Sequence, residues 1–171
     1  MDSTEHNPAL PLVLVCEDEV HMRRLIVTKI RECGCEVMEA RDGKQGLDLA
    51  AARTPALVIT DFQMPNLSGI EMCQVLKTRP ETASTPVFML TARGYVLEPE
   101  ALSATNIVDV LPKPFGVREF IDRVRRLLAS TTRRAVSVIL VVATVMKSPG
   151  SARSRESPSL TPGKGRVRSS R

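Results

Sequence analysis

Short apolar runs alternate with helical patterns through residues 11–132 of this chain. Most of these runs are continuous, which is typical of parallel strands that are buried on both faces. The segments between them repeat apolar residues every three or four positions, as a helix with one buried face does. The pattern predicts five strands, each followed by a helix, and the strands are expected at residues 12–16, 36–40, 56–60, 86–90 and 108–111.

Five strand–helix units in succession predict an α/β fold with one parallel sheet and helices on both of its faces. Right-handed crossovers and short connections leave few arrangements of five such strands. We expect the flavodoxin-like (βα)5 three-layer sandwich, in which the strand order is 2-1-3-4-5. The folded domain is expected to span residues 11–132, after an N-terminal extension at residues 1–10.

The composition changes at Arg133, after the last amphipathic helix. An apolar, β-prone run of twelve residues from Ala135 to Met146 precedes a stretch rich in Ser, Pro, Gly and Arg that continues to Arg171. Such a stretch cannot bury a core, so we expect residues 133–171 to be largely disordered or irregular. The apolar run is shorter than the ~20 residues of a membrane span. It could extend the last helix, bind a partner or favour aggregation, and the sequence selects none of these.

The charge of the chain divides at the same point. The net charge is +5, but residues 133–171 carry nine basic side chains and one acidic one, whereas residues 1–132 carry fifteen basic and eighteen acidic. The expected domain is therefore mildly acidic, and only the tail is basic. Contact with nucleic acid is expected to be weak, sensitive to salt and confined to the tail.

Other features of the composition exclude further classes of protein. With 3% aromatic residues, the chain is not built mainly for stacking on nucleic-acid bases. Its four cysteines lack the spacing of a zinc site and are expected to be reduced thiols. The N-terminus lacks the basic-then-apolar order of a secretory signal, so a cytoplasmic location is expected. The sequence shows no glycine-rich phosphate loop or nucleophile–base pair, which disfavours a metabolic enzyme.

Candidate chemistry lies at the carboxyl ends of the expected strands, where open α/β sheets place functional groups. Glu17 and Asp18 follow the first strand, Asp61 the third, Thr91 the fourth and Lys113 the fifth. Three carboxylates at one edge repel one another, so a cation is expected among them. Hard oxygen ligands with room for water favour Mg2+.

These residue types suit phosphoryl transfer to a carboxylate. That reaction needs a metal ion and a cation in fixed positions around the transferred group, and Asp is a known acceptor. We predict Asp61 as the acceptor, because it is a single carboxylate that opens onto a loop, and we expect Glu17 and Asp18 to hold the metal ion. Lys113 is expected to pair with a carboxylate at rest and with the phosphoryl group later, and Thr91 could donate its hydroxyl to a phosphoryl oxygen.

Four segments at the strand ends occur in a specific order: Leu-Val-Cys-Glu-Asp-Glu (14–19), Ile-Thr-Asp-Phe-Gln-Met-Pro-Asn-Leu-Ser-Gly (59–69), Met-Leu-Thr-Ala-Arg (89–93) and Leu-Pro-Lys-Pro-Phe (111–115). Together they resemble the receiver domain of two-component response regulators, over residues 11–129. The resemblance implies a single-domain signalling switch, not an enzyme, that assists its own aspartyl phosphorylation and dephosphorylation. A sensor histidine kinase or a histidine phosphotransfer protein would be the phosphodonor, and phosphorylation would control binding to an output protein.

The resemblance also implies roles for individual residues. Asp61 would be phosphorylated, and Asp18 and Asp61 would bind Mg2+ directly. The backbone carbonyl of Gln63 would be a further ligand, while Glu17 would act through water. Contacts with the phosphoryl group would come from Thr91 and Lys113, and the peptide bond from this lysine to the following proline is expected to be cis.

One position departs from the family pattern. Members usually place Tyr or Phe three residues before the lysine, where the ring moves inward as the switch residue moves. Here this position is Val110, which cannot report the state of Thr91 through a ring. Two alternatives follow: a docking module that acts without phosphorylation, or nucleic-acid contact through the basic tail. The sequence does not identify the kinase, the output partner or the oligomeric state, and a homodimer is one candidate.

Overall fold

Five parallel strands form the centre of the chain, in the order β2-β1-β3-β4-β5. The computed structural model describes residues 10–92 and 99–146, with side chains through Arg133. The strands are β1 (Leu12–Cys16), β2 (Glu36–Ala40), β3 (Leu57–Asp61), β4 (Val87–Ala92) and β5 (Ile107–Lys113). The helices are α1 (Val20–Glu32), α2 (Gly43–Ala52), α3 (Gly69–Thr78), α4 (Pro99–Ser103) and α5 (Val117–Met146). The fold class and the strand order are those expected from the sequence.

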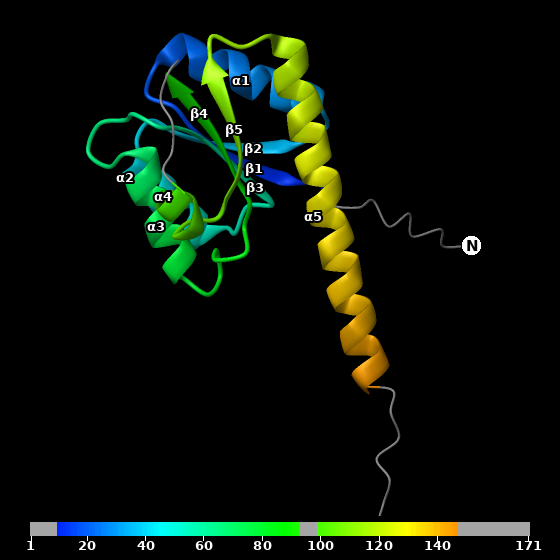
Figure 1. Ribbon diagram of the computed structural model, residues 1–171. Helices are drawn as coiled ribbons and strands as arrows, with labels where there is room; N and C mark the ends of the chain where they lie inside the picture. The colour runs from blue at the N-terminus through cyan, green and yellow to red at the C-terminus, as the bar shows by residue number, and fades with distance from the viewer. Residues whose placement is uncertain (1–9, 93–98, 147–171) are drawn as a thin grey trace, which may run out of the picture.

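Helices cover both faces of the sheet, and Figure 1 shows the resulting three layers. Successive side chains of a strand point to opposite faces. Val13 and Val15 of β1 therefore pack in a core with residues of α1 and α5, whereas Leu14 and Cys16 pack in a second core with residues of α2 and α3. Because both faces of the central strands are buried, their sequences are continuously apolar.

Capping side chains fix the starts of the helices that follow the functional edge of the sheet. The Glu19 carboxylate accepts hydrogen bonds from the first backbone N–H groups of α1, and Asp42 does the same for α2. At the start of α3, Ser68 and Glu71 form a reciprocal capping box. These caps satisfy N–H groups that have no partner within the helix. They thereby hold the turns that join β1, β2 and β3 to their helices.

The last helix is longer than expected. Residues 133–171 were expected to be largely disordered or irregular, with extension of the last helix by the apolar run left open, and α5 runs without a break from Val117 to Met146. No Gly or Pro lies within this range. Compared with Ala, each β-branched residue destabilises a helix by only a few tenths of a kcal/mol, about 0.7 kcal/mol at most. Each further residue adds one backbone hydrogen bond to an existing helix, so the helix continues. Figure 1 shows this part of α5 extending beyond the sheet.

Two of the expected segments lie largely outside the described residues. These are the N-terminal extension, of which only residue 10 is described, and the Ser/Pro/Arg-rich stretch at residues 147–171. Within the described part of the chain, no helix has both the length and the apolar character needed to cross a membrane.

Candidate metal and phosphoryl site

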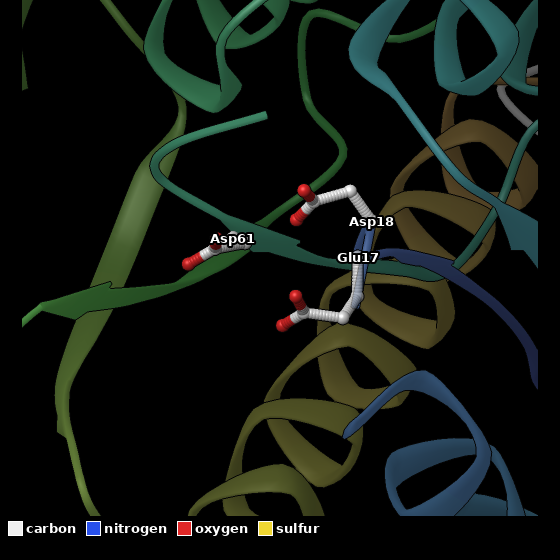
Figure 2. Close-up of side chains that lie close together, drawn as sticks. All are labelled: Glu17, Asp18 and Asp61. Atoms are coloured by element: carbon white, nitrogen blue, oxygen red, sulfur yellow. The ribbon is translucent and has the colours of Figure 1, made fainter. Parts of the chain in front are cut away.

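Three carboxylates meet at the carboxyl edge of the sheet, and Figure 2 shows them together. Strand β1 ends at Cys16, so Glu17 and Asp18 follow it directly, and Asp61 is the last residue of the neighbouring strand β3. One oxygen from each carboxylate lies within 4.8 Å of the others. The sequence therefore predicted this grouping correctly, because parallel neighbouring strands end at the same edge.

Lys113 completes the cluster from the far side of β4. It is the last residue of β5, and its Nζ lies 2.7 Å from Oε2 of Glu17 and 3.0 Å from Oδ1 of Asp61. The peptide bond between Lys113 and Pro114 is cis, as the resemblance implied. We call Glu17, Asp18, Asp61 and Lys113 the carboxyl-edge cluster. The ammonium group of Lys113 lies between the carboxylates of Glu17 and Asp61.

The three acids differ in their exposure to solvent. Glu17 is 1% exposed and Asp61 is 9% exposed, so both are buried, whereas Asp18 is exposed. Burial raises the pKa of Glu17, and the neighbouring Asp61 adds to this, although Lys113 opposes it through a hydrogen bond and its charge. For Lys113, burial lowers the pKa, but contacts with Glu17 and Asp61 outweigh it, and the net effect raises the pKa. The cluster therefore holds its lysine firmly charged.

Thr91 and Gln63 lie near this edge, but neither side chain is joined to the cluster by a described hydrogen bond. Thr91 is buried on β4, one residue beyond the position that pairs with Asp61. Its hydroxyl donates to the backbone carbonyl of Ala92 at 3.0 Å. Gln63 is exposed in the loop two residues after Asp61. The roles expected for Thr91 and for the Gln63 carbonyl remain predictions.

A glycine lets α3 begin close to Asp61. A Cβ built on Gly69 would collide with the backbone carbonyl oxygen of Asp61, and the Gly69 N–H donates to the carbonyl of Phe62 at 2.9 Å. A side chain at this position would force the helix away from the end of β3. Gly69 thus sets the close packing of α3 behind the cluster.

The loop between β3 and α3 is also tied to the start of α2, which sequence reasoning missed. Asn66, whose φ of 65° is left-handed, donates from Nδ2 to Oδ2 of Asp42 at 3.0 Å. Asp42 is also the N-cap of α2, where it accepts from the backbone of Gln45. The sequence signal for the cap was present, since Asp followed three residues later by Gln resembles a capping box. The contact between the two loops had no sequence signal.

Val110 is half-buried on β5, opposite Met89 of β4, and packs against the core beneath α2 and α3. Its backbone carbonyl accepts a hydrogen bond from Nη1 of Arg123 at 3.2 Å. The same Nη1 lies 2.7 Å from Oδ1 of Asp109. Val110 occupies the position where the resemblance implies a mobile ring. In this chain the position is joined to α5 through its backbone carbonyl instead.

The donor set of the cluster fits a hard divalent cation. Mg2+ is bound through one or two carboxylates and keeps several waters, so an exposed Asp18 beside a less exposed Asp61 suits it. The formal charges of three carboxylates and one ammonium group sum to −2, which a divalent ion would neutralise. The residues present therefore fit such an ion.

Fold and site together define an α/β domain with a lysine-bridged acidic cluster at the carboxyl edge of its sheet. Residues 13–125 match the response regulator receiver domain family, and the chain belongs to this family. Among solved structures, it is similar to the receiver domain of the Francisella response regulator 1452, with 34% identity and a TM-score of 0.64, covering 71% of this chain and 98% of that one. A putative response regulator from Chloroflexus aurantiacus is 28% identical with a TM-score of 0.65, covering 70% and 98% of the two chains.

Curated relatives include two transcriptional regulators. The DNA-binding dual master transcriptional regulator RpaA of Synechocystis is 35% identical over 124 residues, 72% of this chain and 52% of the relative. The phosphate regulon transcriptional regulatory protein PhoB of Rhizobium meliloti is 36% identical over 131 residues, 77% of this chain and 58% of the relative. The chain thus spans little more than half the length of these relatives.

Proposed function

We propose that Asp61 accepts a phosphoryl group from a phosphohistidine of a sensor histidine kinase or a histidine phosphotransfer protein. The observation that carries this proposal is the position of Lys113, whose Nζ lies 3.0 Å from Asp61 and 2.7 Å from Glu17. An ammonium group held next to the acceptor carboxylate can stabilise the negative charge that arrives on the transferred group. Of the two acids that Lys113 contacts, Asp61 is the more exposed, at 9% against 1% for Glu17.

The transfer exchanges one bond for another. An oxygen of the Asp61 carboxylate attacks phosphorus, and the new P–O bond forms as the P–N bond breaks. The imidazole keeps the electron pair of the broken bond and, protonated on its other nitrogen, leaves as a neutral ring. Lys113 holds an oxygen of the transferred group, and Thr91 turns its hydroxyl from the Ala92 carbonyl toward another. Mg2+, held by Asp18 and Asp61 with the Gln63 carbonyl and by Glu17 through water, would neutralise charge on the phosphoryl oxygens.

The consequence of phosphorylation is a change in protein binding, in the cytoplasm, at the surface formed by α4, β5 and α5. Movement of Thr91 would displace the end of β4, which pairs with β5 through Pro112 and Lys113. At Val110 the coupling to α5 would use the backbone hydrogen bond from Arg123. The partner is an output protein or a second copy of this chain. This is a local charge change that shifts an equilibrium between two conformations.

The proposal is tested by intact mass after treatment with acetyl phosphate and Mg2+. The wild-type chain should gain the mass of one phosphoryl group, and omission of Mg2+ should abolish the gain. Asp61→Ala should gain nothing, whereas the control Asp48→Asn, changed at an exposed position on α2, should behave as the wild type. Full labelling of Asp61→Ala would remove Asp61 from this role.

Val110 favours a second candidate function, a docking module that works without phosphorylation. Its half-buried side chain lacks the ring expected to report the state of the site. A Mg2+ titration separates the two candidates, since an idle site should show no binding at millimolar Mg2+.

The basic tail offers a third candidate, contact with nucleic acid, and the relative RpaA is described as DNA-binding. Comparison of the full chain with one that ends at Met146 tests it. DNA binding that weakens with salt and is lost on truncation would support a role for residues 147–171.

A further inference from the structure

An arginine on α1 reaches back to the backbone that carries two of the three acids. Nη1 of Arg23 donates to the main-chain carbonyl of Glu17 at 2.7 Å and to that of Asp18 at 3.3 Å. The side chain is only 18% exposed, and its Nε lies 3.9 Å from Oε2 of Glu39 on β2. Arg23 therefore lies between the end of β1 and the neighbouring strand and does not extend into solvent.

The two residues that it contacts lie between regular elements. Strand β1 ends at Cys16 and α1 begins at Val20, so the peptides of Glu17 and Asp18 belong to the connecting turn. The N–H of Glu17 still donates to the carbonyl of Ala40 at 3.1 Å, which continues the pairing with β2. The carbonyls of Glu17 and Asp18 lie beyond the end of β1, and Arg23 donates hydrogen bonds to both of them.

Rotation of these two peptides would redirect both carboxylates, because each side chain is attached to the same short turn. Three carboxylates within 4.8 Å of one another repel, which favours such a rotation. A guanidinium group is planar and presents its donors in a rigid arrangement, so it resists the rotation better than a flexible ammonium group.

We propose that Arg23 is a positioning residue for the divalent cation: it holds the turn so that Glu17 and Asp18 face Asp61. This inference rests on the proposed function of the carboxyl-edge cluster. The positive charge of Arg23 taken alone would weaken binding of a cation, whereas its hydrogen bonds strengthen it. The two contributions have opposite signs, so a measured affinity distinguishes them.

The experiment is a Mg2+ titration of the full chain, monitored by backbone NMR. The wild type is compared with the variants Arg23→Met, Arg23→Lys and Arg24→Met. Arg24 is the exposed neighbour on the same helix and serves as a control of equal charge change. Loss of groups that orient metal ligands costs about 10- to 100-fold in metal affinity. We expect Arg23→Met to bind Mg2+ about tenfold more weakly, Arg23→Lys to be intermediate, and Arg24→Met to match the wild type.

The readout is the Mg2+ affinity of samples that circular dichroism shows to be fully folded, so a general loss of structure would not imitate the effect. If Arg23→Met does not fold, Arg23→Lys decides the matter. Unchanged or tighter binding in the folded Arg23 variants would overturn this role alone. Failure of the wild-type chain to bind Mg2+ would overturn the proposed function and, with it, this role.

Discussion

Replacement of Lys113 by Met tests the electrostatics of the carboxyl-edge cluster. Met keeps most of the length and the apolar stem of the side chain but removes the ammonium group. Glu17, which is almost fully buried, would then lose its partner, and Asp61 would lose the same cation. We expect the variant to be less stable than the wild type in the absence of metal ions.

The size of the effect follows from the two distances. At 2.7 Å and 3.0 Å, each contact contributes about 6 kcal/mol of Coulomb attraction at an effective dielectric constant of about 20. Desolvation offsets most of this, and loss of one partner of a buried pair costs about 3 to 5 kcal/mol. Lys113 is 23% exposed, so we expect a loss at the lower end, about 3 kcal/mol in the free energy of unfolding.

The loss should depend on pH. Burial already raises the pKa of Glu17 in the folded state above its ordinary value of 4.5, so its ionisation opposes folding as the pH rises through that region. Without Lys113, the pKa rises further and the penalty grows. The difference between variant and wild type should therefore be larger at about pH 7 than at about pH 5, where more of Glu17 is protonated. If the carboxyl-edge cluster binds Mg2+ as proposed, added Mg2+ should reduce the difference, because the ion would bind only the folded state and would replace the lost positive charge.

These differences can be measured by urea unfolding in EDTA at both pH values, with circular dichroism as the readout. Lys77→Met, at an exposed position on α3, is the matched control and should change stability by less than about 0.5 kcal/mol. Equal stability of Lys113→Met and the wild type at about pH 7 would refute the reasoning, and so would a difference that does not change with pH.

Two further substitutions test the packing around the site. Gly69→Ala should cost about 2 kcal/mol in thermal or urea unfolding, because its Cβ would collide with the carbonyl of Asp61. Gly116→Ala, which has open space but lies at the N-cap of α5, should cost less, about 1 kcal/mol at most. Equal effects of the two glycine variants would contradict the close approach of α3. Phe120→Ala should cost about 4 kcal/mol, because its buried ring stacks on Phe88 with centroids 5.8 Å apart; a loss below about 1 kcal/mol would show that α5 is not anchored there.

Local pattern was sufficient for the sheet and for the residues at its edge. Continuous apolar runs identify strands buried on both faces, and an acid that follows or ends such a run must lie at the carboxyl edge when neighbouring strands are parallel. This is why Glu17, Asp18 and Asp61 could be grouped in advance, although 44 positions separate the first from the last. Local pattern left the end of α5 open, because an apolar, β-branched run is compatible with a strand by composition and with a helix once a helix already precedes it.

The sequence by itself determined which elements form, their order and which side chains lie at one edge, since these depend on periodicity and on chain connectivity. Only the tertiary structure decided that one ammonium group lies between Glu17 and Asp61, that Arg23 holds the turn after β1, and that Asn66 reaches Asp42. Each of these contacts depends on distances of a few ångströms between segments set by the packing of helices on the sheet, and no repeat along the chain encodes such distances.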